Sequence, residues 1–310
     1  EYGAFNCSGE QMPVHEDVNN TIAFIEKSSK ENKPFFINLW MHEPHTPHHV
    51  IPKYQWRFQD LAEDDNIYAS ILSHADDRIG ELLDALDRLK LTDNTLVVFS
   101  SDNGPARAVY EVKELKLMFD SATGAGFDTS ASKGITGGRK GYKASLFEGG
   151  IGVPFIVRWP GKVKAGAIDN TSLISAVDLL PTFCAIANVT LPEAYKPDGI
   201  NQEATLLGKE YALRTKPLFW KFNSNWPAKK KAPDHWVSYA VVYQNWKLVA
   251  NNDLSFFELY DIVEDVFEKN DLKNEQAEVA EKLINSIKRW QKELPEGPSE
   301  KLFSKERQKK

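Results

Sequence analysis

The stretch from Thr95 to Gly104, Thr-Leu-Val-Val-Phe-Ser-Ser-Asp-Asn-Gly, constrains the fold more than any other part of this chain. Residues 96–100 are rich in β-branched and aromatic side chains, which is typical of a strand buried on both faces in a parallel sheet. Ligands of open α/β sheets bind just beyond the carboxyl ends of the strands. Asp102 and Asn103 therefore stand where chemistry is expected, either as oxygen ligands of a cation such as Ca²⁺ or Mg²⁺ or as ordinary turn residues.

A long helix is predicted immediately before this strand. Apolar residues recur every three or four positions from Ile67 to Lys90, with charged residues on the opposite face, so the apolar stripe should pack on the sheet. Residues 34–40, Pro-Phe-Phe-Ile-Asn-Leu-Trp, indicate a second buried strand, and residues 151–159 indicate a third. A strand, a long helix and a strand in this order are typical of the βαβ unit of a parallel sheet.

Composition limits the class of protein. A chain of 310 residues can hold one large α/β domain, or one domain and a small companion. A net charge of −6 without a basic stripe argues against a nucleic-acid partner, and the apolar runs are too short to predict a membrane span. Cys7 and Cys184 give no disulfide framework. The chain starts at Glu1 without Met or a signal peptide, as in a mature chain or a fragment.

Two polar segments stand out as candidate sites. Four of the seven histidines lie between His42 and His49, directly after the strand predicted at residues 34–40. This loop suits general acid–base chemistry or metal binding, or is a surface loop with incidental histidines. Residues 137–150 are rich in glycine, and their concentrated positive charge suits a phosphate or sulfate group, or is an exposed basic turn. The charged residues of this second segment are Arg139, Lys140 and Lys143.

The remaining chain predicts a helix and then a small α+β unit. The helix covers residues 172–187 and contains Asp178, for which a structural role is favoured. The unit has four strands and a helix with an apolar stripe; these cover residues 216–222, 236–243, 246–250, 257–262 and 277–290. We predict a larger α/β domain over residues 1–210 and a small subdomain over residues 211–310.

Three segments in this order resemble the sulfatase family of the alkaline-phosphatase superfamily. They are the Pro-His-Thr-Pro loop around His45, the Asp-Asn-Gly turn that ends at Gly104, and Lys143 placed five residues before Glu148-Gly149-Gly150. Residues 76–80, 153–161 and 176–182 are similar to the family as well, and the resemblance covers roughly residues 20–190. It implies an alkaline-phosphatase-like, mostly parallel sheet flanked by helices, followed by a small antiparallel sheet with one helix.

The resemblance also implies sulfuric ester hydrolysis, on a sulfated carbohydrate or an aryl sulfate. In sulfatases, the residue matching His45 contacts the sulfate ester and protonates the leaving oxygen. Those matching Asp102 and Asn103 ligate Ca²⁺, and the one matching Lys143 contacts sulfate oxygens. By the same resemblance, residues next to these in the sequence would contact the substrate; they are His42, His48, His49, Arg139 and Lys140. The resemblance also implies a periplasmic, extracellular or lysosomal compartment.

The chain also departs from the family pattern. Sulfatases have a Cys or Ser nucleophile in a Cys-x-Pro-x-Arg pattern, oxidised to formylglycine, and neither Cys7 nor Cys184 has this setting. The paired aspartates of the first strand and a Lys-x-His site are also missing, and Gly152 stands where relatives often have Arg. We therefore expect the C-terminal part of a sulfatase, inactive on its own, with formylglycine in a missing N-terminal portion. Alternatives are a two-zinc phosphatase or phosphodiesterase of the same superfamily, or a non-catalytic glycan-binding remnant.

Overall fold

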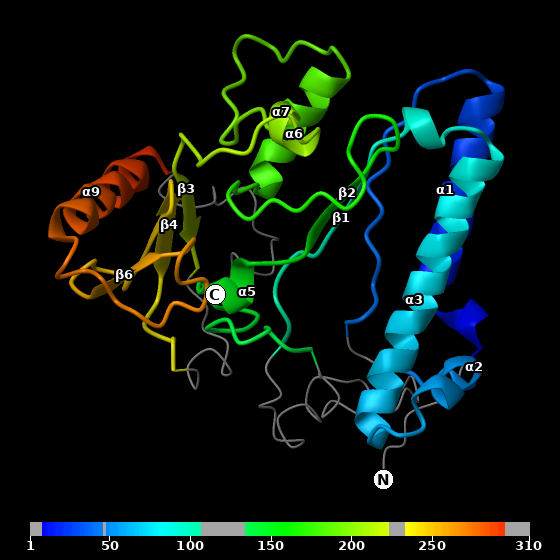
Figure 1. Ribbon diagram of the computed structural model, residues 1–310, viewed down its shortest axis with the longest axis horizontal. Coiled ribbons are helices and arrows are strands. Elements are labelled where there is room, and N and C mark those ends of the chain that lie inside the picture. Colours follow the sequence, from blue (N-terminus) through cyan, green and yellow to red (C-terminus); the bar gives the residue numbers. More distant parts are fainter. Residues whose placement is uncertain (1–7, 46–47, 107–133, 223–232, 295–310) are drawn as a thin grey trace, which may run out of the picture.

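The computed structural model describes residues 8–45, 48–106, 134–222 and 233–294 (Figure 1). The helices are α1 (Pro13–Lys30), α2 (Pro52–Gln55), α3 (Glu63–Arg88), α5 (Glu148–Ile151), α6 (Ala176–Ile186), α7 (Glu203–Leu206) and α9 (Ala277–Glu293). Three 3₁₀ turns are η1 (Gly9–Gln11), η2 (Trp56–Phe58) and η3 (Thr92–Asn94). The strands are β1 (Val97–Ser100), β2 (Phe155–Arg158), β3 (Leu218–Lys221), β4 (Tyr239–Tyr243), β5 (Trp246–Ala250) and β6 (Phe257–Asp261). None of the described helices combines the length and the apolar character that crossing a bilayer requires.

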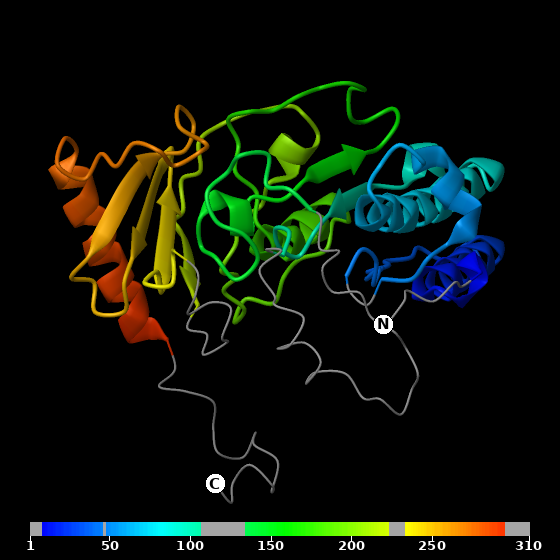
Figure 2. The same ribbon diagram turned by 90° about the horizontal axis from the view of Figure 1, so that it is seen from below.

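The elements form three groups along the molecule, as two perpendicular views show (Figures 1 and 2). Helices α1 and α3 lie side by side at one end, and the sheet β3–β6 with α9 forms the other end. Strands β1 and β2 and the short helix α5 lie between them. The Asp-Asn-Gly turn follows β1 and the glycine-rich segment leads into α5, so two of the three segments in which the sequence predicts a site adjoin this middle group.

The predicted long helix is confirmed as α3, which begins four residues earlier and ends two residues earlier than expected. Helix α1 has Pro13 in its first turn, where the missing amide hydrogen costs nothing. The amino-terminal half of the α3 stripe packs against α1 and α2 instead of a sheet, because these helices offer apolar faces of their own. The buried residues of this cluster are Met12, Val14, Val18, Val50, Ile51, Tyr54, Ile67 and Ile71.

The middle strands differ from the prediction in two ways. Strand β1 pairs with β2 in the antiparallel sense, with Val97 opposite Arg158. The expectation that β1 is buried on both faces is wrong, since Phe99 is 44% exposed and Ile156 on β2 is 58% exposed. Residues 34–40 are extended and alternate in exposure, yet they form no strand, because the described residues place no hydrogen-bonded ladder beside them.

The four strands and the helix predicted near the C-terminus are all confirmed. The sheet is antiparallel in the order β3-β4-β5-β6. Helix α9 covers one face, where the ring of Trp290 stacks on Phe219 with 5.0 Å between the centroids. The opposite face packs against Leu146 and Phe147 of the glycine-rich segment. One face of the C-terminal sheet therefore packs against the segment that carries Lys143.

Helix α6 begins at a buried polar cluster. Ser175 and Asp178 form a capping box, in which Asp178 accepts a hydrogen bond from the Ser175 amide at 2.8 Å. The carboxylate of Asp178 also pairs with the buried guanidinium of Arg214, at 2.6 and 2.8 Å. These contacts support the structural role expected for Asp178, and the role of Arg214 emerges only from the structure.

Candidate active site

His45 and Lys143 meet although they are 98 residues apart in the sequence. The amide of His45 donates a hydrogen bond to the carbonyl of His42 at 3.0 Å, which closes a turn after the extended segment 34–40. The side-chain nitrogen Nζ of Lys143 lies 3.1 Å from Nε2 of His45. A lysine ammonium can only donate, so Nζ of Lys143 donates and Nε2 of His45 accepts in this contact.

The Asp-Asn-Gly turn follows the end of β1 and is tied to the glycine-rich segment. Asp102 accepts a hydrogen bond from the amide of the next residue, Asn103, at 2.9 Å, whereas an Asx turn would use the amide of Gly104. The amide of Gly104 donates to the carbonyl of Gly150 at 2.9 Å. Two residues after Asn103, the carbonyl of Pro105 accepts from the amide of Lys143 at 2.8 Å. Backbone hydrogen bonds therefore link the predicted metal pair to the predicted anion contact.

Glycines are required where these two backbones cross. A Cβ at Gly104 would lie 1.9 Å from the carbonyl oxygen of Gly149. Within the glycine-rich segment itself, a Cβ at Gly149 would lie 2.3 Å from the carbonyl oxygen of Gly141. Real Cβ atoms do not approach backbone oxygens this closely, so the crossing depends on glycine.

Asp102 and Asn103 could supply part of a hard-cation site. A carboxylate and a carboxamide at a strand end are oxygen donors of the kind that Ca²⁺ prefers, and the Asp102 side chain is exposed. Across the described residues, no cluster of three or more His, Cys, Asp or Glu side chains is arranged to hold a metal. The pair thus fits the expected ion in chemistry but supplies only some of its ligands.

The other residues predicted to contact substrate are dispersed. His42 and Arg139 are exposed, and the ring of His42 lies 5.9 Å from that of His45. His48 is buried, with Nε2 2.9 Å from the carbonyl of Pro44. His49 is half-buried, and this burial lowers its pKa. Cys184 lies in α6, and Cys7 is outside the described residues.

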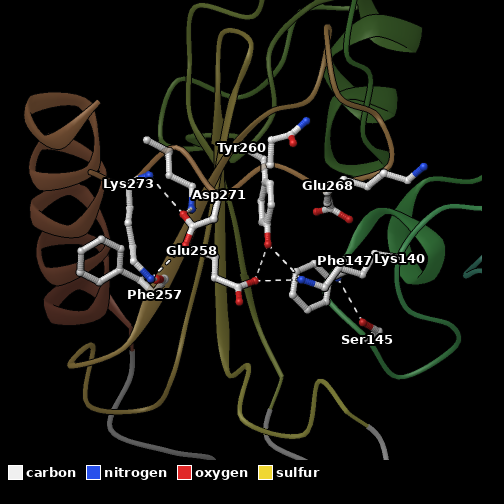
Figure 3. A network of polar contacts seen from close by, with 12 residues as sticks. Lys140, Ser145, Phe147, Phe257, Glu258, Tyr260, Glu268, Asp271 and Lys273 are labelled. Carbon is white, nitrogen blue, oxygen red and sulfur yellow. Dashed lines mark hydrogen bonds and ion pairs between the residues drawn. The ribbon is translucent and has the colours of Figure 1, made fainter. Parts of the chain in front are cut away.

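Lys140 points toward the C-terminal sheet (Figure 3). Its Nζ lies 2.9 Å from the Glu258 carboxylate and 3.0 Å from the Tyr260 hydroxyl. The same ammonium lies 4.0 Å from the centroid of the Phe147 ring, a cation–π contact. Sequence reasoning missed Glu258 and Tyr260. Their two-residue spacing in a predicted strand places both on one face, but nothing local identifies what that face contacts.

Comparisons with known proteins show the family to which the chain is related. The sulfatase family model matches residues 1–189, and the model of the C-terminal region of N-sulphoglucosamine sulphohydrolase matches residues 140–293. The N-acetylgalactosamine-6-O-sulfatase of Bacteroides thetaiotaomicron is 29% identical over 293 residues, which are 88% of this chain and 51% of that protein. Human N-acetylgalactosamine-6-sulfatase is 30% identical over 213 residues, which are 69% of this chain and 35% of that protein.

A solved structure extends the likeness to the fold. The complex of Ps i-CgsB with k-i-k-neocarrahexaose has a TM-score of 0.70 and 25% identity, and the match covers 89% of this chain and 54% of that chain. Such neighbours confirm the alkaline-phosphatase-like fold class. This chain spans about half the length of the first curated relative. Because the sulfatase family model covers more than half of its residues, the chain belongs to the sulfatase family, as its motifs predict.

Proposed function

We propose that this chain carries part of the active site of an enzyme that hydrolyses sulfate esters. The contact between Lys143 and His45, 3.1 Å apart at the edge of the glycine-rich segment, is the observation that supports this most. In this proposal Lys143 neutralises sulfate oxygens as negative charge develops on them. His45 gives a proton to the oxygen that leaves the sulfur, since an alkoxide is a poor leaving group without one. This requires that the sulfate oxygens draw the Lys143 ammonium from Nε2 of His45, so that this nitrogen can carry the proton.

Asp102 and Asn103 are proposed to bind Ca²⁺, which would help to neutralise the sulfate group. Further oxygen ligands would come from parts of the protein beyond the described residues. The nucleophile is proposed to be a formylglycine in a Cys-x-Pro-x-Arg segment outside this chain, because neither Cys7 nor Cys184 has that setting. The contribution of this chain is therefore to bind the anion, orient it and supply the proton.

The substrate is proposed to be a sulfated carbohydrate. The names of two relatives specify N-acetylgalactosamine 6-sulfate groups, and the neighbour of known structure was solved with a carrageenan-type oligosaccharide. The exposed side chains of His42 and Arg139 are proposed to contact the sugar. His48 is buried and Lys140 is engaged with the C-terminal sheet, so we do not include them. A periplasmic, extracellular or lysosomal compartment would suit such a substrate.

The first prediction tests the proton donor in an intact enzyme that contains this chain. His45→Ala should lower kcat by about 10²–10⁴-fold for alkyl or sugar sulfates, as for a lost general acid. The loss should be smaller for activated aryl sulfates, because their leaving groups need less protonation. Steady-state kinetics with a series of sulfate esters of increasing leaving-group pKa measures this dependence.

Lys143→Ala is the matched control for this experiment. It should lower kcat/KM by a similar factor for every ester in the series, because sulfate oxygens are common to all of them. A His45→Ala loss that does not depend on the leaving group would contradict the acid role. Faster turnover of the corresponding phosphate esters than of the sulfate esters would favour the phosphatase alternative instead.

A further inference from the structure

The segment that carries Lys143 is attached at both of its ends to the same face of the C-terminal sheet. Lys140, three residues before Lys143, contacts Glu258 and Tyr260 on β6. Glu148, five residues after Lys143, contacts Lys247 on β5 at 2.7 Å. In the β5–β6 register, Lys247 lies directly opposite Tyr260, so the two attachments are neighbours on one sheet surface.

The attachment at Glu148 is a buried charge cluster. The Lys247 ammonium is fully buried and lies 2.9 Å from the Glu268 carboxylate as well as 2.7 Å from Glu148. Burial disfavours the ammonium, but the charges of Glu148 and then Glu268 outweigh it and raise the pKa of Lys247. Glu268 also accepts a hydrogen bond from the amide of Glu148 at 2.7 Å. This end of the segment is therefore held by both main chain and side chain.

The attachment at Lys140 is smaller and more accessible. The side chain of Lys140 is 39% exposed and that of Glu258 is 19% exposed. The Tyr260 hydroxyl is hydrogen-bonded to Glu258, so the ammonium, the carboxylate and the phenol form one polar group (Figure 3). The Lys140 carbonyl accepts a hydrogen bond from the amide of Gly149 at 2.7 Å, which closes the segment on itself. Displacing Lys140 would loosen this closure and the loop between the two attachments.

We propose that Glu258 and Tyr260 are positioning residues, which hold the ammonium of Lys143 at His45 by fixing Lys140. The proposal rests on the function proposed above for Lys143. It assigns the C-terminal sheet a part in the site without requiring that a residue of the sheet touch the substrate. Because a shift of about 1 Å in a site residue can cost up to about 10²-fold in rate, holding the loop matters for turnover.

The first test needs no enzymatic activity. In the 310-residue chain, Glu258→Gln with Tyr260→Phe should increase hydrogen exchange in peptides covering residues 141–149, including the Lys143 amide that is bonded to Pro105. Lys282→Met is the matched control, because its ammonium lies 5.2 Å from the Tyr243 ring on the α9 face of the same sheet. Lys140→Met should resemble the double variant, and Lys140→Arg should retain protection. Unchanged exchange in the double variant would overturn the proposal.

The second test measures whether the effect acts through Lys143 in the intact enzyme. The pair Glu258→Gln and Tyr260→Phe should lower kcat/KM for an aryl sulfate by about 10–10²-fold. In a Lys143→Ala background the same pair should have almost no further effect, since the group being positioned is absent. An equal loss in both backgrounds would indicate general damage and overturn the positioning role. Increased exchange without turnover by the wild-type enzyme would support the anchoring and contradict the proposed function.

Discussion

His74 on α3 makes the free energy of unfolding depend on pH. Burial, followed by the charge of Arg78, lowers the pKa of His74 from its ordinary value of 6.5. Below about pH 6.5 the unfolded chain therefore binds a proton that the folded chain resists, so stability falls as the pH decreases. We expect the free energy of unfolding to drop between pH 7.5 and 5.5 more steeply in the wild type than in His74→Gln. Urea titrations measure both slopes, and parallel slopes would contradict this.

At the scale of single elements, the ion pair between Asp178 and Arg214 stabilises the amino-terminal end of α6. Both side chains are fully buried, so removing one partner leaves an unpaired buried charge. Arg214→Met should destabilise the protein by about 3–5 kcal/mol. Arg88→Met is the matched control, since the exposed pair of Arg88 and Glu26 should contribute about 0–1 kcal/mol. Equal losses in urea unfolding would show that the buried pair has no special role.

At the scale of the whole molecule, the chain should lack catalytic activity by itself. In the proposed mechanism it supplies a proton donor, an anion contact and two cation ligands, but neither cysteine stands in the Cys-x-Pro-x-Arg pattern of a sulfatase nucleophile. Without a covalent nucleophile the remaining groups cannot supply the reaction path. We expect no turnover of an activated aryl sulfate with Ca²⁺ above that of a His45→Ala control. Turnover above that control would place the nucleophile in this chain, with Cys7 as the first candidate.

How much of the molecule could be predicted depends on whether its interactions are local. The long helix and the C-terminal strands were predictable because periodicity within one segment determines their type. The partner of β1 is not encoded locally, so its antiparallel pairing with β2 was missed. The motifs predict that His45 and Lys143 both contact the sulfate group, whereas the contact of Lys140 with Glu258 spans 118 residues of sequence and no motif predicts it.

The glycine crossing between Gly104 and Gly149 has a consequence for the evolvability of the site. A saturation library at these positions should recover almost only glycine, because any larger side chain meets a carbonyl oxygen. The side chains of Arg139 and His42 are exposed, so these two positions have no such restriction. Substitutions that adapt the site to a new sugar would therefore be concentrated at Arg139 and His42, while Gly104 and Gly149, which hold the segment of Lys143, would stay unchanged.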